Sequence, residues 1–105
     1  MNEAAERIFE RSVVDLAKMN GWLVHNPRPA RYQRDWMKGW PDLCLIRIDP
    51  NGGAGDTIFA ELKTPVGRLS AEQVTLLKHL AKSGFECHVW RPNDLQRIAD
   101  RLAKR

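Results

Sequence analysis

Two acidic residues and a lysine lie close together in the middle of the chain, in a pattern suited to holding a metal ion. Glu61 and Lys63 are two residues apart in an apolar run that predicts a β-strand, so both side chains project from one face. Asp42 begins the preceding apolar run, directly after Trp40 and Pro41. An antiparallel hairpin between the two runs would bring the carboxylates of Asp42 and Glu61 together.

Paired carboxylates of this kind suit Mg²⁺ or Mn²⁺, which take oxygen ligands and need few protein groups when water and a substrate phosphate complete the shell. Such an ion acidifies a bound water and neutralises charge on the phosphate. A lysine beside that water can orient it or stabilise the transition-state charge. An acidic residue two before a lysine is also common at a solvated sheet edge, so the surrounding motifs carry the weight.

A further acidic residue is expected from the amino-terminal helix. Apolar residues recur at helical spacing over residues 3–20, in a stripe that includes Phe9 and Leu16, and Gly21 ends the pattern. Glu6 stands at the edge of this stripe, one turn before Phe9. We expect Glu6 to face inward and to contact the metal through water.

Four short apolar runs predict β-strands, at residues 22–26, 43–48, 57–64 and 85–90. Turn-forming residues separate the second run from the third, so these two should form an antiparallel hairpin. The second run is continuous enough in apolar residues to be a central strand.

Two more helices are predicted after the hairpin. Ser70 and Gln73 form a capping box for a helix that ends at Gly84, and Asp94 can cap a last helix through Leu102. The order helix, three strands, helix, strand, helix predicts a single α/β domain over residues 1–105. Its small mixed sheet has flanking helices, and the crossover helix makes the third and fourth strands parallel.

Basic residues gather in one proline-containing segment. The chain has a formal net charge of +4 and a pI near 9.4, which favours polyanionic partners. Arg28, Arg31, Arg34 and Lys38 form a candidate backbone-binding loop, although such a loop is also compatible with simple solvation. Trp40 is equally compatible with stacking on an unpaired base and with packing against the first helix.

Composition excludes several other classes of protein. With 43% hydrophobic residues in 105, the chain can form one core without disulfides. Cys44 and Cys87 lie in apolar runs and are expected to be buried, reduced thiols, with no zinc-like Cys/His spacing. No leader-like or membrane-spanning apolar stretch is present. We therefore expect a cytoplasmic protein that does not associate with membranes.

The combination of motifs resembles the PD-(D/E)xK nucleases, and within them the VRR-NUC (virus-type replication-repair nuclease) group. The resemblance covers nearly the whole chain. It rests on Glu6, the stretch 13–22, His25, Gly39 to Asp42, Glu61 to Lys63, Gly67 to Ser70 with Gln73, and Val89 to Pro92.

This resemblance implies a restriction-endonuclease-like core that cuts DNA phosphodiesters with Mg²⁺ or Mn²⁺. It assigns metal binding to Asp42, Glu61 and the Leu62 backbone carbonyl, catalysis to Lys63 and Gln73, and an accessory acid role to Glu6. From the residues alone, Gln73 is explained as well by its place in the capping box.

The basic segment and the resemblance together provide candidates for DNA binding. The DNA-contacting candidates are His25, Arg28, Arg31, Arg34, Lys38 and Arg68. Stand-alone members of the group look like homodimeric Holliday-junction resolvases of phage or bacterial origin, acting in recombination and DNA repair. Branched DNA is thus the expected substrate, with a flap, nicking or restriction-type nuclease, or a non-catalytic DNA-binding module, as alternatives.

Overall fold

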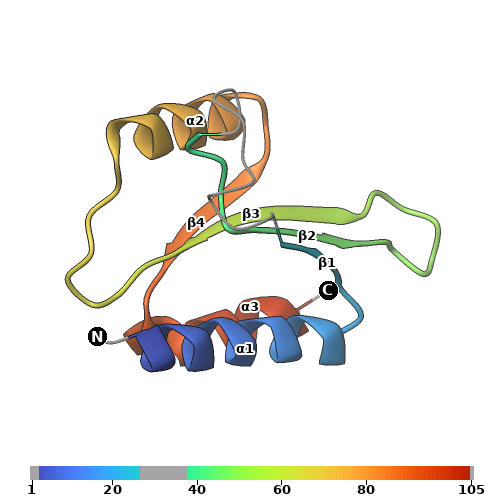
Figure 1. The fold of residues 1–105 in the computed structure, drawn as a ribbon. Helices are drawn as coiled ribbons and strands as arrows, with labels where there is room; N and C mark the ends of the chain where they lie inside the picture. Colours follow the sequence, from blue (N-terminus) through green and yellow to red (C-terminus); the bar gives the residue numbers. More distant parts are fainter. Residues whose placement is uncertain (1–2, 27–37, 105) are drawn as a thin grey trace.

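A four-stranded sheet with helices on both faces forms the framework. The computed structural model describes residues 3–26 and 38–104. The elements are α1 (Glu3–Met19), β1 (Leu23–His25), β2 (Leu43–Arg47), β3 (Asp56–Leu62), α2 (Ala71–Lys82), β4 (Glu86–Trp90), the 3₁₀ turn η3 (Pro92–Asp94) and α3 (Leu95–Ala103). Figure 1 shows α1 and α3 side by side on one face and α2 on the other. None of these helices is long and apolar enough to cross a membrane.

The strands are ordered β1-β2-β3-β4, so β2 and β3 are central. β2 and β3 form the predicted antiparallel hairpin, with Leu43 opposite Ala60. β3 and β4, which α2 connects, are parallel as predicted, with Leu62 opposite Trp90. The small mixed α/β sheet flanked by helices is thus confirmed, and it is compatible with a restriction-endonuclease-like fold.

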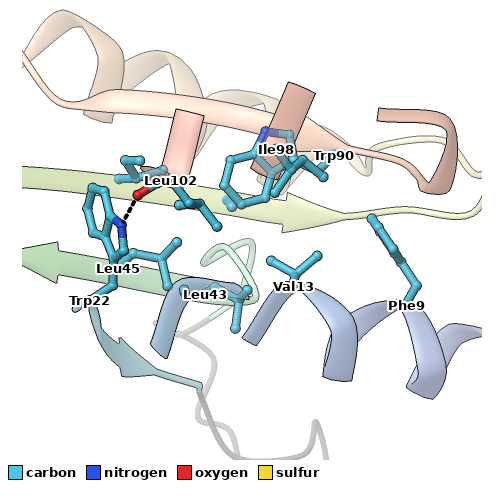
Figure 2. Close-up of a cluster of buried hydrophobic side chains, with 11 residues drawn as sticks. Phe9, Val13, Trp22, Leu43, Leu45, Trp90, Ile98 and Leu102 are labelled. Atoms are coloured by element: carbon cyan, nitrogen blue, oxygen red, sulfur yellow. Dashed lines mark hydrogen bonds between the residues drawn. The ribbon is translucent and has the colours of Figure 1, made fainter. Parts of the chain in front are cut away.

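The hydrophobic core fills the space between the sheet and the α1/α3 layer. Alternate residues of β2 and β3 face it, while buried residues of α1 and α3 come from the helical stripes. Figure 2 shows Val13, Leu43, Leu45, Ile98 and Leu102 among the buried side chains. Burying each such side chain contributes about 1.5–3 kcal/mol, so this layer fixes the position of the sheet.

Helix ends follow the local signals in two cases and depart from them in one. Gly21 has a φ of 83°, the left-handed conformation that ends α1. Ser70 and Gln73 form the predicted capping box at α2. Asp94 stands at the N-cap position of α3 as predicted, but its side chain makes no capping hydrogen bond to that helix. η3 leads directly into that helix, and the Asp94 carboxylate accepts hydrogen bonds from the Arg91 backbone and from Arg97 instead.

The sheet face towards α2 is only partly covered. Cys44 and Cys87 lie on this face, in register with Phe59 between them. Both are free thiols, as expected, but they are half-buried. The expectation of full burial was wrong because the short helix α2 covers only part of the sheet (Figure 1).

One buried charge joins the far end of the hairpin to both helices beneath it. Arg47, at the end of β2, is 4% exposed. Its guanidinium donates to the backbone carbonyls of Leu102 (2.7 Å), Asn20 (3.3 Å) and Lys104. It also lies 4.3 Å above the Trp22 ring, whose Nε1 donates to the same Leu102 carbonyl (Figure 2). The cation thus satisfies carbonyls that the ends of α1 and α3 leave without intrahelical partners.

Replacing Arg47 with alanine is expected to lower the free energy of unfolding by about 3 kcal/mol, because the carbonyls at the ends of α1 and α3 and the Asp56 carboxylate lose a shared donor. Urea unfolding followed by tryptophan fluorescence measures this effect. The matched control is Arg97→Ala, which removes an arginine that is 85% exposed in a surface ion pair, and it should change stability by less than about 1 kcal/mol. Equal losses in the two variants would contradict the anchoring role of Arg47.

Candidate active site

Two hydrogen bonds link the Asp42 and Glu61 regions at the open end of the β2–β3 hairpin. The backbone N–H of Asp42 donates to Oε1 of Glu61 (3.2 Å), and the backbone N–H of Leu62 donates to Oδ2 of Asp42 (2.8 Å). These bonds hold the two carboxylates side by side, as the hairpin predicted. Because Leu43 pairs with Ala60, the register itself sets Asp42 opposite Glu61.

Glu61 has two side-chain partners besides Asp42. Lys63 Nζ lies 3.5 Å from Glu61 Oε2, which confirms that the two side chains share a face. Gln73 Nε2 donates to the same oxygen at 2.7 Å. Meanwhile Gln73 Oε1 accepts from the Ser70 backbone N–H at 2.8 Å. Gln73 therefore serves the capping box and the carboxylate at once, because the two ends of its amide point to different partners.

These residues line a cavity of about 570 Å³ between α1, the end of the hairpin and α2. Its walls are formed by Glu6, Arg7, Phe9, Glu10, Asp42, Glu61, Leu62, Lys63, Thr64, Gly67 and Gln73. Glu6 thus lies on the cavity wall as expected from the helix, although its side chain is exposed. Acidic and basic groups converge on one pocket with access to solvent.

Burial strongly perturbs the central carboxylate. Glu61 is only 3% exposed. Loss of solvation is the largest cause that raises the pKa of Glu61 from 4.5 to about 7, and repulsion from Asp42 is the second. The charge of Lys63 opposes this shift. A cation bound beside Glu61 would compete with the proton that this environment favours.

The donor set fits a hard divalent cation. Asp42 and Glu61 offer two carboxylates within one pocket, which suits Mg²⁺ or Mn²⁺ because these ions retain waters and accept phosphate oxygens. Among the described residues, no group of three or more His, Cys, Asp or Glu side chains is arranged to hold a metal ion by itself. A closed zinc-like site therefore does not arise from that part of the chain.

Arg91 belongs to the Val89-to-Pro92 stretch of the resemblance, but the sequence did not predict its supporting role. Its Nη1 donates to the backbone carbonyls of Thr64 (2.5 Å) and Gly67 (2.8 Å), both of which line the cavity. It thereby fixes the loop between Lys63 and α2. Its position in the sequence could have indicated this role, because Arg91 directly follows β4 at the same end of the sheet as Glu61.

Three of the DNA-binding candidates are among the described residues, and all three are exposed. His25 is exposed at the end of β1, and Arg68 is exposed beside Gly67 of the cavity wall. Lys38 is also exposed, but it lines a different hollow. The remaining candidates lie outside the described residues, and they are Arg28, Arg31 and Arg34.

A mixed sheet that presents two carboxylates and a lysine at the end of its central hairpin is the arrangement of a PD-(D/E)xK-type nuclease. Consistently, the VRR-NUC domain model matches residues 18–93, and the chain belongs to this family. The chain is therefore a nuclease domain.

A plant relative agrees with the family assignment. The chain is 37% identical over 60 residues to the Fanconi-associated nuclease 1 homolog of Arabidopsis thaliana. The match covers 57% of this chain but 7% of that protein's length. No solved structure matches the chain significantly.

Without divalent ions, the protein is expected to lose stability as the pH rises through about 7, since Glu61 then ionises in a buried site. Because the pKa of Glu61 is higher in the folded than in the unfolded state, its protonation stabilises the native state fully below about pH 4.5, the unfolded pKa. This stabilisation is lost as the pH rises through the folded pKa of about 7. Urea unfolding in a chelator from pH 5.5 to 8 should show a fall of the order of 2–3 kcal/mol. Glu61→Gln should abolish this component.

The exposed glutamate Glu72 provides the control, and Glu72→Gln should keep the pH dependence of the wild type. Hydrogen bonds from Arg101 lower the pKa of Glu86 below 4.5, so its stabilisation is lost only at more acidic pH. If Glu61→Gln and the wild type had parallel pH profiles, burial of Glu61 would not be the cause.

Proposed function

We propose that this domain is a divalent-metal-dependent DNA endonuclease that hydrolyses phosphodiester bonds at the Asp42–Glu61 pocket. The observation that carries the proposal is the buried Glu61 carboxylate, held beside Asp42 and contacted by both Lys63 and Gln73. A carboxylate pair needs a compensating cation at neutral pH, and a phosphodiester needs its charge neutralised before attack. One bound ion meets both needs.

In this proposal Asp42 and Glu61 hold Mg²⁺ or Mn²⁺, which supplies Lewis acidity at the scissile phosphate when bound. The ammonium of Lys63, 20% exposed on the pocket wall, orients the attacking water or stabilises charge in the transition state. Gln73 positions Glu61 through the 2.7 Å hydrogen bond. Glu6, on the wall formed by α1, is an accessory acid that acts through water.

Branched DNA is the proposed substrate, cut by a homodimer as in Holliday-junction resolution. Membership of the VRR-NUC family supports DNA as the substrate, and the net charge of +4 is compatible with a polyanionic substrate. Because paired incisions on opposing strands require two pockets, a dimer is expected when the solution mass is measured.

Lys63→Ala is expected to reduce cleavage by at least about 100-fold, since it removes a charge that acts in the transition state. Labelled four-way junction, flap, single-stranded and linear duplex DNA should be incubated with Mg²⁺, Mn²⁺ or chelator, and the products separated on denaturing gels. Junction or flap DNA should be cut fastest, and chelation should stop all cutting.

The control for this experiment is Lys82→Ala, which removes an exposed lysine from the last turn of α2. It should cleave as the wild type does. Cleavage that survives chelation or Lys63→Ala would overturn the mechanism, whereas preference for linear duplex would overturn only the substrate.

Gln73→Ala and Ser70→Ala separate helix capping from positioning of Glu61. Both variants break the capping box and should lose about 1 kcal/mol of stability. Only Gln73→Ala also removes the hydrogen bond to Glu61. It should therefore raise the Mg²⁺ concentration for half-maximal cleavage by about 10-fold. An equal shift in Ser70→Ala would indicate that helix stability alone is responsible.

A further inference from the structure

A second hollow, of about 420 Å³, lies between the segment that precedes Asp42 and helix α2. Lys38 and Trp40 line one side of it, and Thr75, Leu76 and His79 of α2 are on the other. Each segment thus contributes to both cavities. In the first segment, Trp40 lines the second hollow and Asp42 lines the catalytic pocket. In α2, Glu72 lines the second hollow and its neighbour Gln73 lines the catalytic pocket. The two cavities are therefore lined by neighbouring residues of the same two chain segments.

Trp40 is both exposed and held in place. It is 44% exposed, yet its ring packs on Phe59 with centroids 6.3 Å apart and planes inclined by 51°. Phe59 is in turn supported edge-on by Phe85 at 5.4 Å. By strand alternation Phe59 faces away from the α1 layer, so packing of Trp40 against α1 is not observed. A supported indole with an exposed surface is preorganised for stacking.

Close approach to α2 depends on the residue before Trp40. Gly39 has a φ of +86°, and a Cβ atom there would lie 2.6 Å from the backbone oxygen of Glu72. Only glycine combines this conformation with this contact. Gly39 therefore fixes the distance between the Trp40 segment and the first turn of α2.

We propose that this hollow, the Trp40 hollow, binds an unpaired nucleobase of the DNA whose backbone occupies the catalytic pocket. The inference rests on the nuclease function proposed above and deepens it. An indole stacks on any base, because every base has a π-face. Lys38 adds positive charge for the adjoining phosphate.

The other groups in the hollow fit a base better than a phosphate. The ring of His79 is held by a hydrogen bond between Nδ1 and the Thr75 carbonyl (2.9 Å). The Glu72 carboxylate repels phosphate but accepts from a base amino group. A base within a continuous duplex is stacked on its neighbours and cannot enter. The hollow thus selects DNA with an unpaired nucleotide beside the cut, as at flaps and junctions.

Binding in a chelator tests the proposal independently of catalysis. The probe is a duplex with a single-stranded flap that carries 2-aminopurine at the first unpaired position, mixed with the Lys63→Ala protein. Stacking on Trp40 should quench the probe. Introducing Trp40→Ala into the Lys63→Ala protein should abolish this quench and weaken binding about 10-fold. Introducing Trp40→Phe instead should keep much of the quench and of the affinity. The matched control is Ile48→Ala, an exposed apolar residue beyond β2, which should bind and quench normally.

A substrate change avoids any effect of the variants on folding. Replacing the first unpaired nucleotide by an abasic one should weaken binding to the Trp40-containing protein about 10-fold and leave binding of Trp40→Ala unchanged. Equal affinity for the abasic and intact flaps, or additive losses, would overturn the proposal. Normal quenching by a wild-type protein that fails to cut DNA would instead overturn the nuclease proposal and keep the hollow.

Discussion

The carboxylate of Glu61 is buried at the end of a central strand, where it needs partners because an isolated buried charge costs several kcal/mol. Its partners come from three separate segments. The Asp42 backbone precedes β2, Lys63 follows β3, and Gln73 belongs to α2. The pocket can therefore form only when the hairpin has closed and α2 has packed against it. Burial of this one group makes the candidate chemistry dependent on the whole fold.

The hairpin has a different role at each of its two ends. At one end, Asp42 and the buried Glu61 lie on the wall of a cavity. At the other end, Arg47 is enclosed by Trp22 and by the carboxyl ends of α1 and α3. The carboxylates at the first end favour a bound cation. At the second end, the guanidinium of Arg47 already has its partners within the protein. The core between them holds both ends in register.

The capping box of α2 links local helix stability to the site. The side-chain oxygen of Gln73 accepts from the Ser70 backbone N–H at the start of the helix, and its side-chain nitrogen donates to Glu61. Its neighbour Glu72 meets Gly39 on the opposite side of the same turn. One helical turn thus sets the position of the Glu61 carboxylate and of the Trp40 segment. In the proposed mechanism, cleavage and recognition of an unpaired base would be coupled through this turn.

The sequence by itself determined the order of helices and strands, the hairpin, the capping box and the approach of Asp42 to Glu61. These features depend on neighbours along the chain, on periodicity and on strand register. Only the tertiary structure decided that Arg47 is buried, that Arg91 supports the pocket loop, that Gln73 has two partners and that Trp40 packs on Phe59. Asp94 takes its expected N-cap position, but its carboxylate accepts from the Arg91 backbone and from Arg97 instead of capping α3. Long-range packing decides which surfaces meet, and a side chain's partners follow from that contact and not from its neighbours in sequence.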